Sequence, residues 1–342
     1  MKEFILFGKT DDGAGEAIEY IRKNGGEMLG WVDSNPAKQD EDAQVYAPSF
    51  VAKHPSATVV IMSDKIKEIS EFIQRSGWEN KIVVYPHLRS SYYDREILQQ
   101  KAWCLENETS LREIYAQDDV YTVQLLDEML AQRTAEIFSF IPLGRMIDFS
   151  HINLYFYDKA IAPQGDITLV NGGAYTGDSI EEIYRSYGER LKKIYAFEPD
   201  RNNISSLKKR MEKLGIVERV EPINCGLSDH EDSMLFSAEG TIASAFSETG
   251  EESVPLVTID SMVQEVVGDL CINMDIEGFE VAALKGAKKS ILKYHPYLAI
   301  CVYHKMGDFL DVPNAIRDIR GDYKFYLRCG AHPECYAVPV RK

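Results

Sequence analysis

Residues 168–179 read TLVNGGAYTGDS, the pattern of a buried strand that runs through a glycine-rich turn into a helix. Glycine suits such a turn because, without a Cβ, its backbone can bend tightly and approach a ligand. The helix expected to begin at Asp178 would offer free N–H groups to a polar ligand. This glycine turn (residues 172–177) is weak evidence by itself, since many strand–helix turns use glycine only for packing.

An acidic residue at the end of the next strand favours a nucleoside site. Residues 195–199 read YAFEP, so Glu198 ends an apolar strand and precedes a proline. In doubly wound folds, a carboxylate about 20 residues after the glycine turn accepts hydrogen bonds from ribose hydroxyls. The alternative is a loop carboxylate that faces water, and the apolar strand before Glu198 makes it the weaker interpretation.

Strand-like and helix-like segments alternate around this turn. Strands are expected at residues 167–170, 193–197, 220–225, 254–258, 271–274, 298–302, 324–327 and 336–340. Helices are expected at residues 178–187, 201–214, 261–267 and 279–293. The alternation predicts an α/β fold with a mostly parallel sheet, and the last two strands predict an antiparallel C-terminal hairpin.

The first 90 residues alternate in the same way over a shorter length. Apolar runs lie at residues 4–7, 28–32, 58–62 and 81–84, with helical segments at 14–24 and 65–76. They predict a small Rossmann-like α/β domain with about four parallel strands. The next segment has helical spacing and no strand runs, which predicts a helical bridge. The predicted domains are therefore residues 1–90, 91–150 and 151–342.

The composition favours a cytoplasmic enzyme that acts on small molecules. The 342 residues carry a formal net charge of −16, and an acidic surface repels nucleic acids and anionic lipids. No stretch reaches the roughly 18 apolar residues of a membrane span, and the N-terminal apolar run is too short for a signal peptide. The six cysteines form no CxxC pair, and Cys225, Cys271 and Cys301 lie in apolar runs as expected for buried, reduced thiols.

We therefore expect no nucleic-acid or membrane partner. The first domain or the helical bridge could join two chains as a homodimer. A second glycine turn at residues 8–15, with Asp33 as its acidic partner, could suggest a nucleotide site there, but Asp11 and Asp12 would repel a pyrophosphate. A structural or acceptor-recognition role is the favoured interpretation of this domain.

Four motifs resemble those of the FkbM-type methyltransferases. That family shows a GAxxGD loop, an FEPD strand end, a GLSD segment and an MDIEGxE motif. This chain has them in that order at residues 173–178, 197–200, 226–229 and 274–280. Residues 285–287 and 301–305 also look like the family, so the resemblance covers roughly residues 150–340. It implies a class I methyltransferase fold that binds S-adenosylmethionine.

The resemblance also implies which residues surround the cofactor. The methionine end would be held by Asn171, Gly173, Ala174, Tyr175, Gly177 and Asp178. The ribose would be held by Glu198 beside Pro199. The adenine would lie along residues 224–229, with Asn224, Gly226 and Ser228. Asp275 is expected to contact both cofactor and acceptor.

Asn171 departs from the family pattern, which usually has Asp there. That carboxylate helps to hold the ammonium group of the cofactor, often through water. Asn keeps an acceptor oxygen without the charge, so binding should weaken by about 1 kcal/mol or more. This leaves open a non-catalytic binding protein with a degenerate cofactor loop.

Asp275, Glu277 and His304 are the candidate catalytic residues. A methyl group on a sulfonium is already activated, so transfer chiefly needs alignment, and a base helps when the acceptor is a hydroxyl. Asp275 follows a strand and is the first choice, whereas Glu277 could assist it or help to hold a divalent metal. No pattern of residues supports a metal site. His304 follows another strand and could also act as a base.

Three further residues receive weaker predictions. Glu280 is expected to cap a helix or face the surface, and Asp178 with Glu181 fits a capping box. Ser244 lies where the family has a serine near the cofactor or acceptor.

The function expected from these features is S-adenosylmethionine-dependent O-methylation of a sugar, polysaccharide or secondary metabolite. An NAD(P)-dependent sugar-nucleotide oxidoreductase or epimerase would share the glycine turn and the acidic residue. It does not account for the DIEGxE motif.

Overall fold

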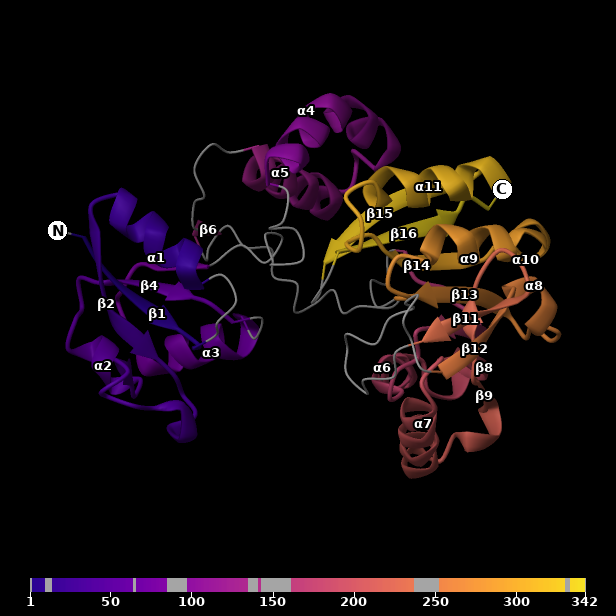
Figure 1. The fold of residues 1–342 in the computed structure, drawn as a ribbon, viewed down its shortest axis with the longest axis horizontal. Helices are drawn as coiled ribbons and strands as arrows, with labels where there is room; N and C mark the ends of the chain where they lie inside the picture. Colours follow the sequence, from indigo (N-terminus) through magenta and orange to yellow (C-terminus); the bar gives the residue numbers. More distant parts are fainter. Residues whose placement is uncertain are drawn as a thin grey trace. The chain divides into compact units, whose positions relative to one another are not determined.

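The computed structural model describes residues 2–9, 14–63, 66–84, 97–134, 141–142, 161–236, 252–329 and 333–341. Contacts between residues divide the chain into two compact units (Figure 1). The first comprises Met1–Glu108 and Leu126–Ser150, and the second comprises Thr109–Leu125 and His151–Lys342. No helix in the described ranges is both long and apolar enough to cross a membrane.

The first unit contains a six-stranded sheet in the order β3-β2-β1-β4-β5-β6. Its strands are β1 Lys2–Phe7, β2 Gly26–Val32, β3 Val45–Tyr46, β4 Thr58–Ile61, β5 Ile82–Val84 and β6 Ile141–Pro142. The four predicted strands are present and parallel, as expected. β3 and the antiparallel β6 were not predicted, because two-residue strands leave no apolar run to recognise.

Helices cover both faces of this sheet. Successive side chains of β1 point to opposite faces, so they pack against different helices. Phe4 and Leu6 pack in a cluster with α1 (Ala14–Lys23), whereas Ile5 and Phe7 pack in a cluster with α3 (Ile66–Ser76). Among the described residues up to Thr134, the other helical segments are a short 3-10 turn at Pro36–Lys38, α2 Ser49–Ala52, α4 Ile97–Ile114 and α5 Val120–Thr134. The helical periodicity of residues 92–140 predicted helices of this kind.

The second unit contains a seven-stranded sheet in the order β15-β16-β14-β13-β7-β8-β9. Its strands are β7 Ile167–Gly172, β8 Leu191–Phe197, β9 Val220–Ile223, β13 Asp269–Met274, β14 Tyr297–Cys301, β15 Tyr323–Cys329 and β16 Pro333–Pro339. All pairs are parallel except those of β16, which is antiparallel to β14 and β15. The predicted α/β fold with an antiparallel C-terminal hairpin is confirmed.

A separate three-stranded sheet lies in the second unit, in the order β10-β12-β11. It consists of β10 Gly226–Leu227, β11 Asp232–Phe236 and β12 Glu252–Val257. The strand predicted at residues 220–225 ends at Ile223 instead, and the strand predicted at 254–258 belongs to this small sheet. Ser244 lies outside the described residues.

Two of the predicted helices have the expected bounds, α6 Asp178–Tyr187 and α7 Arg201–Leu214. The helix predicted at residues 261–267 is wrong, because α8 is a short helix, Ile259–Met262. The helix predicted at residues 279–293 is two helices, α9 Glu280–Gly286 and α10 Lys288–Tyr294. Gly286 lies so close to residue Ser228 that a Cβ would be 2.1 Å from its carbonyl oxygen, and α9 ends there. α11 (Asp308–Ile319) was not predicted, and it contains Pro313.

The core of the second unit surrounds β7, whose six residues are all buried. Leu169 packs in one cluster with Ile180 and Ile183 of α6 and with Leu207 and Met211 of α7. Burial on both faces fits the apolar residues Ile167, Leu169 and Val170, which do not alternate with exposed ones, while the buried Thr168 and Asn171 form hydrogen bonds. The cysteines predicted to be buried thiols, Cys225, Cys271 and Cys301, are free and buried.

Candidate functional site

The candidate site lies at the carboxyl edge of the seven-stranded sheet. β7 has β8 on one side and β13 on the other, so the chain reverses its winding direction at β7. Ligands of open α/β sheets bind in the crevice at such a reversal. The ends of β7, β8, β13 and β14 carry the glycine turn, Glu198, Asp275 and His304 respectively. The predicted site residues therefore come from adjacent strands.

Packing alone accounts for the glycines of the turn. Gly173 has φ +71°, and a Cβ there would lie 1.9 Å from the carbonyl oxygen of Asp275. Gly177 has φ +82°, and its Cβ would lie 2.9 Å from Cε of Met211. The N–H groups of Gly173 and Ala174 donate to the carbonyl of Phe197, at 3.0 and 2.9 Å. The turn is thus wedged between the ends of β8 and β13.

The N-terminus of α6 has no side-chain cap. The predicted capping box of Asp178 and Glu181 is wrong, because the N-cap is Gly177, which has no side chain. Asp178 is exposed, and Glu181 pairs instead with Arg210 at 2.8 Å. A helix end without a cap presents N–H groups to a ligand, as the sequence predicts.

Glu198 fastens the glycine turn to the end of β8. Its side chain is buried, with Oε2 accepting from Tyr175 N at 2.8 Å. Oε1 accepts from Asp200 N at 2.9 Å and from Nδ2 of Asn203 at 3.3 Å. Burial raises the pKa of Glu198, although these donors oppose the change. A carboxylate has about four acceptor positions, so this arrangement leaves room for a ribose hydroxyl.

Asn171 belongs to a buried polar network inside the sheet. Its Nδ2 donates to Oδ1 of Asn273 at 2.7 Å, and its Oδ1 accepts from the Ser179 hydroxyl at 3.1 Å. Nδ2 of Asn273 continues the network to the carbonyl of Ala299, at 3.4 Å. Both polar atoms of Asn171 are therefore bonded to protein, so its amide supports the sheet.

The predicted adenine side lies next to the glycine turn. Nδ2 of Asn224 donates to the carbonyls of Glu198 and Pro199, at 3.0 and 2.7 Å, and so fixes the segment after β8. Ser228 is buried, and its N–H donates to the carbonyl of Val257 at 2.9 Å. Gly226 and Leu227 form β10. Leu227 packs against Gly172, where an added Cβ would lie 2.8 Å from Cδ1 of Leu227.

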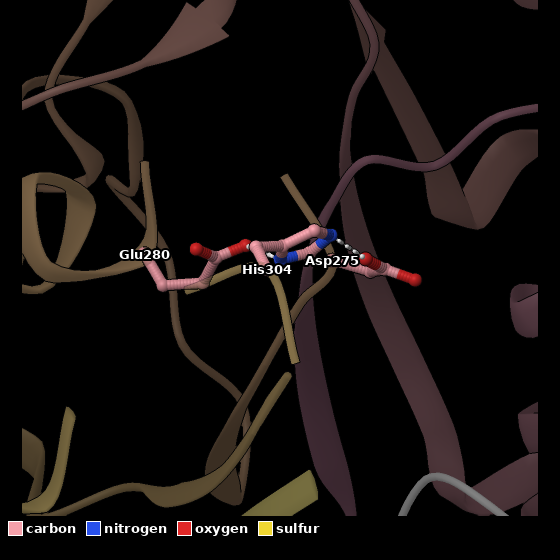
Figure 2. Close-up of side chains that lie close together, drawn as sticks. All are labelled: Asp275, Glu280 and His304. Carbon is pink, nitrogen blue, oxygen red and sulfur yellow. Dashed lines mark ion pairs between the residues drawn. The ribbon is translucent and has the colours of Figure 1, made fainter. Parts of the chain in front are cut away.

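Three acids of residues 275–280, which we call the acidic turn, surround His304 (Figure 2 shows two of them). Nε2 of His304 lies 3.2 Å from Oδ1 of Asp275 and 3.5 Å from Oε2 of Glu277. Nδ1 lies 3.1 Å from Oε1 of Glu280. The side chains of His304 and Glu280 are 5% and 1% exposed, whereas Asp275 and Glu277 are 30% and 31% exposed. The cluster is therefore open on one side only.

The acidic turn makes His304 a cation. Burial lowers the pKa of the ring, but Asp275 and Glu280 outweigh burial and raise the pKa to about 10. A raised pKa favours the protonated ring, which balances the charge of the surrounding acids.

Glu280 shapes the acidic turn from inside. Its Oε1 accepts from the N–H groups of Ile276 and Gly278, at 2.9 and 3.4 Å. The prediction of an exposed Glu280 is wrong, because it reaches back under the turn towards His304. The turn itself requires positive φ at Glu277 (+55°) and at Gly278 (+92°). Such strain is commonly kept at functional sites.

Two residues near His304 were not predicted. The Tyr303 hydroxyl donates to both carboxylate oxygens of Asp275, at 3.0 and 3.3 Å. Buried Asp308 accepts from the N–H of Lys305 at 2.7 Å. Residues 301–305 already look like the family in sequence, so Tyr303, which directly precedes His304, could have been named as a candidate.

Comparisons with known proteins agree with this fold. Residues 171–330 match the family model described as the methyltransferase FkbM domain. The crystal structure of methyltransferase FkbM from Methylobacillus flagellatus KT is similar, with 20% sequence identity and a TM-score of 0.59, over 98% of this chain and 90% of that chain. A putative methyltransferase from Streptococcus mutans in complex with SAH gives 16% identity and a TM-score of 0.33, over 52% and 90% of the two chains. No curated protein matches the chain.

Proposed function

We propose that the chain methylates a hydroxyl group with S-adenosylmethionine as the donor, because residues 171–330 match the methyltransferase FkbM domain and contain the four motifs. The acceptor class that we propose is a sugar, polysaccharide or secondary metabolite. A small acceptor suits the formal net charge of −16, which opposes binding of nucleic acid.

The observation that carries the proposal is the position of the glycine turn. On one side, the N–H of Tyr175 bonds to Glu198, the residue expected to hold a ribose. On the other side, Gly173 touches the backbone of Asp275, whose carboxylate is partly exposed. A nucleoside held at Glu198 would therefore reach towards Asp275 along the turn.

The residues at this edge fit S-adenosylmethionine. Glu198 keeps acceptor capacity for a hydroxyl, and α6 begins without a cap at the turn. The exposed carboxylates of Asp275 and Glu277 would favour a sulfonium over a neutral or anionic group. Asn171 does not fit as a ligand of the ammonium group, since its amide is used within the sheet.

Asp275 is the residue that would take the acceptor proton. When bound, S-adenosylmethionine would supply an activated methyl group. Tyr303 and His304 hold the Asp275 carboxylate in one orientation, and its exposed part faces the site. The proton of the acceptor hydroxyl would pass to Asp275 while the hydroxyl oxygen takes the methyl group. The bond between the methyl carbon and sulfur would break, which leaves neutral S-adenosylhomocysteine. Glu277 lies beside Asp275, and burial raises the pKa of Glu277, so it is the second candidate.

Calorimetry on the full chain tests cofactor choice. We expect S-adenosylhomocysteine to bind with one site per chain and NAD⁺ to show no binding. Glu198→Gln should weaken the affinity at least about tenfold, because a charged acceptor is lost. The control is Glu221→Gln. Glu221 lies on β9 and is an exposed partner of Lys193, so this variant should bind the nucleoside normally.

Circular dichroism and Tm of the Glu198→Gln chain establish whether it is folded, since Glu198 also anchors the turn. Binding of NAD⁺ in place of S-adenosylhomocysteine would contradict the proposal and favour an oxidoreductase. Absence of binding by either nucleoside at millimolar concentration would also contradict it.

A further inference from the structure

We propose that Asp275, Glu280 and His304 form a binding site for one divalent transition-metal cation. Each residue offers a ligand atom, and the three atoms lie within 4.8 Å of one another (Figure 2). Two carboxylate oxygens and one imidazole nitrogen suit ions such as Mn²⁺ and Zn²⁺ better than Ca²⁺, which prefers oxygen ligands alone.

The spacing of the ligand atoms fits a shared ion. Nε2 of His304 lies 3.2 Å from Oδ1 of Asp275, and Nδ1, the other ring nitrogen, lies 3.1 Å from Oε1 of Glu280. Ligands at about 2.1 Å from one ion stand about 3.0–3.4 Å apart in octahedral or tetrahedral geometry. The three ligand atoms lie within 4.8 Å of one another, so one of the carboxylates must move towards the ring nitrogen that binds the ion.

Buried polar atoms of the cluster lack hydrogen bonds. Among the described residues, both ring nitrogens of His304 and Oε2 of Glu280 are buried without a hydrogen-bond partner. The carboxylates lie at ion-pair distance from the ring, but not along its N–H bonds. Asp275 and Glu280 lie at opposite ends of the ring, one at each nitrogen (Figure 2). Buried polar atoms without hydrogen bonds are costly and call for an explanation such as a bound ion.

Outer residues hold the candidate ligands in place. The Tyr303 hydroxyl fixes Asp275, and the N–H groups of Ile276 and Gly278 fix Oε1 of Glu280. Glu277 lies 3.5 Å from the ring and is partly exposed, so it can serve as a further ligand or bind a coordinated water. Such support around the ligands is typical of metal sites.

The cation would take the place of a ring proton, because histidine binds metals only as the neutral ring. It would then face the open side of the cluster, where the proposed acceptor hydroxyl binds. Only this role at the acceptor rests on the proposed function, and the binding of the ion does not.

Binding of Mn²⁺ and Zn²⁺ to the full chain, after removal of metals with EDTA, tests the site. Calorimetry and, for Mn²⁺, electron paramagnetic resonance should show one saturable site per chain. His304→Gln and Asp275→Asn should each weaken binding at least about tenfold. Tm and circular dichroism of the metal-free variants establish that both are folded.

The chain offers a matched control at His230. This histidine also lies between two acids, 2.5 Å from Asp229 and 3.6 Å from Asp232, but its side chain is 64% exposed. His230→Gln should leave the site intact. No saturable binding to the natural chain, or loss of binding in His230→Gln with retention in His304→Gln, would overturn the proposal.

Binding of S-adenosylhomocysteine is measured in the same samples. If the nucleoside binds and the ion does not, the proposed ion is wrong while the proposed function stands. If the ion binds and the nucleoside does not, the proposed function is wrong while the ion site stands.

Discussion

The glycine turn and the acidic turn follow neighbouring strands, yet they use their polar groups in opposite ways. In the glycine turn, Gly173 and Ala174 bond to β8, and Tyr175 bonds to Glu198. In the acidic turn and the adjoining His304, buried atoms of Glu280 and His304 lack hydrogen bonds. The polar groups of the glycine turn therefore mainly hold the turn in place. The buried polar atoms without hydrogen bonds lie instead beside the acidic turn.

Replacing Gly173 should have the largest effect on stability. Gly173→Ala places a Cβ 1.9 Å from the Asp275 carbonyl, so the two turns must separate. We expect the free energy of unfolding to fall by more than about 3 kcal/mol. Urea unfolding measures it.

Gly215→Ala is the matched control, because Gly215 has the same φ of +71° and no atom within 4 Å of the added Cβ. It should cost only about 1 kcal/mol, the penalty of the left-handed conformation. Equal losses in the two variants would show that Gly173 is needed for its φ alone.

Replacing Asp275 should affect turnover without affecting nucleoside binding. Asp275→Asn removes the proposed base, so kcat should fall about 100-fold with any hydroxyl acceptor that the natural chain methylates. Affinity for S-adenosylhomocysteine should change little. Asp322→Asn is the control, since Asp322 is an exposed partner of Arg320. An unchanged kcat in Asp275→Asn would remove Asp275 from the reaction.

Replacing Asn171 tests whether its amide supports the sheet. Asn171→Leu leaves buried polar groups of Asn273 and Ser179 without partners, and should cost about 2 kcal/mol of unfolding free energy. Exposed Asn202→Leu should stay within about 0.5 kcal/mol. A loss of affinity for S-adenosylhomocysteine in Asn171→Leu, with stability unchanged, would show instead that Asn171 contacts the cofactor.

Replacing Asp308 should change the pH dependence of stability. Burial, with Glu280 nearby, raises the pKa of Asp308 from 3.8 to about 6. The folded chain holds the proton of Asp308 more tightly than the unfolded chain does, so protonation stabilises the fold. This stabilisation is complete below about pH 4 and is lost as the pH rises through 6.

Urea unfolding between pH 4 and 7, in EDTA, measures this loss. Asp308→Asn should make the stability depend less steeply on pH across that range. Asp311→Asn changes an exposed acid in the same first turn of α11 and should leave the dependence unchanged. Identical profiles for the natural chain and Asp308→Asn would contradict the assignment.

Sequence patterns predicted the elements whose signals are local. α6 and α7 were predicted with their bounds because their amphipathic spacing is clear and Asp200 caps α7. The sequence also placed Glu198, Asp275 and His304 at strand ends, which parallel strands bring to one edge.

The other features depend on contacts between distant segments. The break between α9 and α10 follows from the approach of Gly286 to Ser228. The burial of Glu280 depends on the strained turn at Glu277 and on the strand before His304. No local pattern records these contacts, so Glu280 was predicted only to cap a helix or face the surface.

A crystal structure with S-adenosylhomocysteine tests the central claim most directly. The account predicts that the nucleoside lies at the carboxyl edge of the second unit, with its ribose hydroxyls within hydrogen-bond distance of Glu198 and its sulfur facing Asp275. Binding at the glycine turn of residues 8–15, or an empty edge at saturating nucleoside, would contradict it.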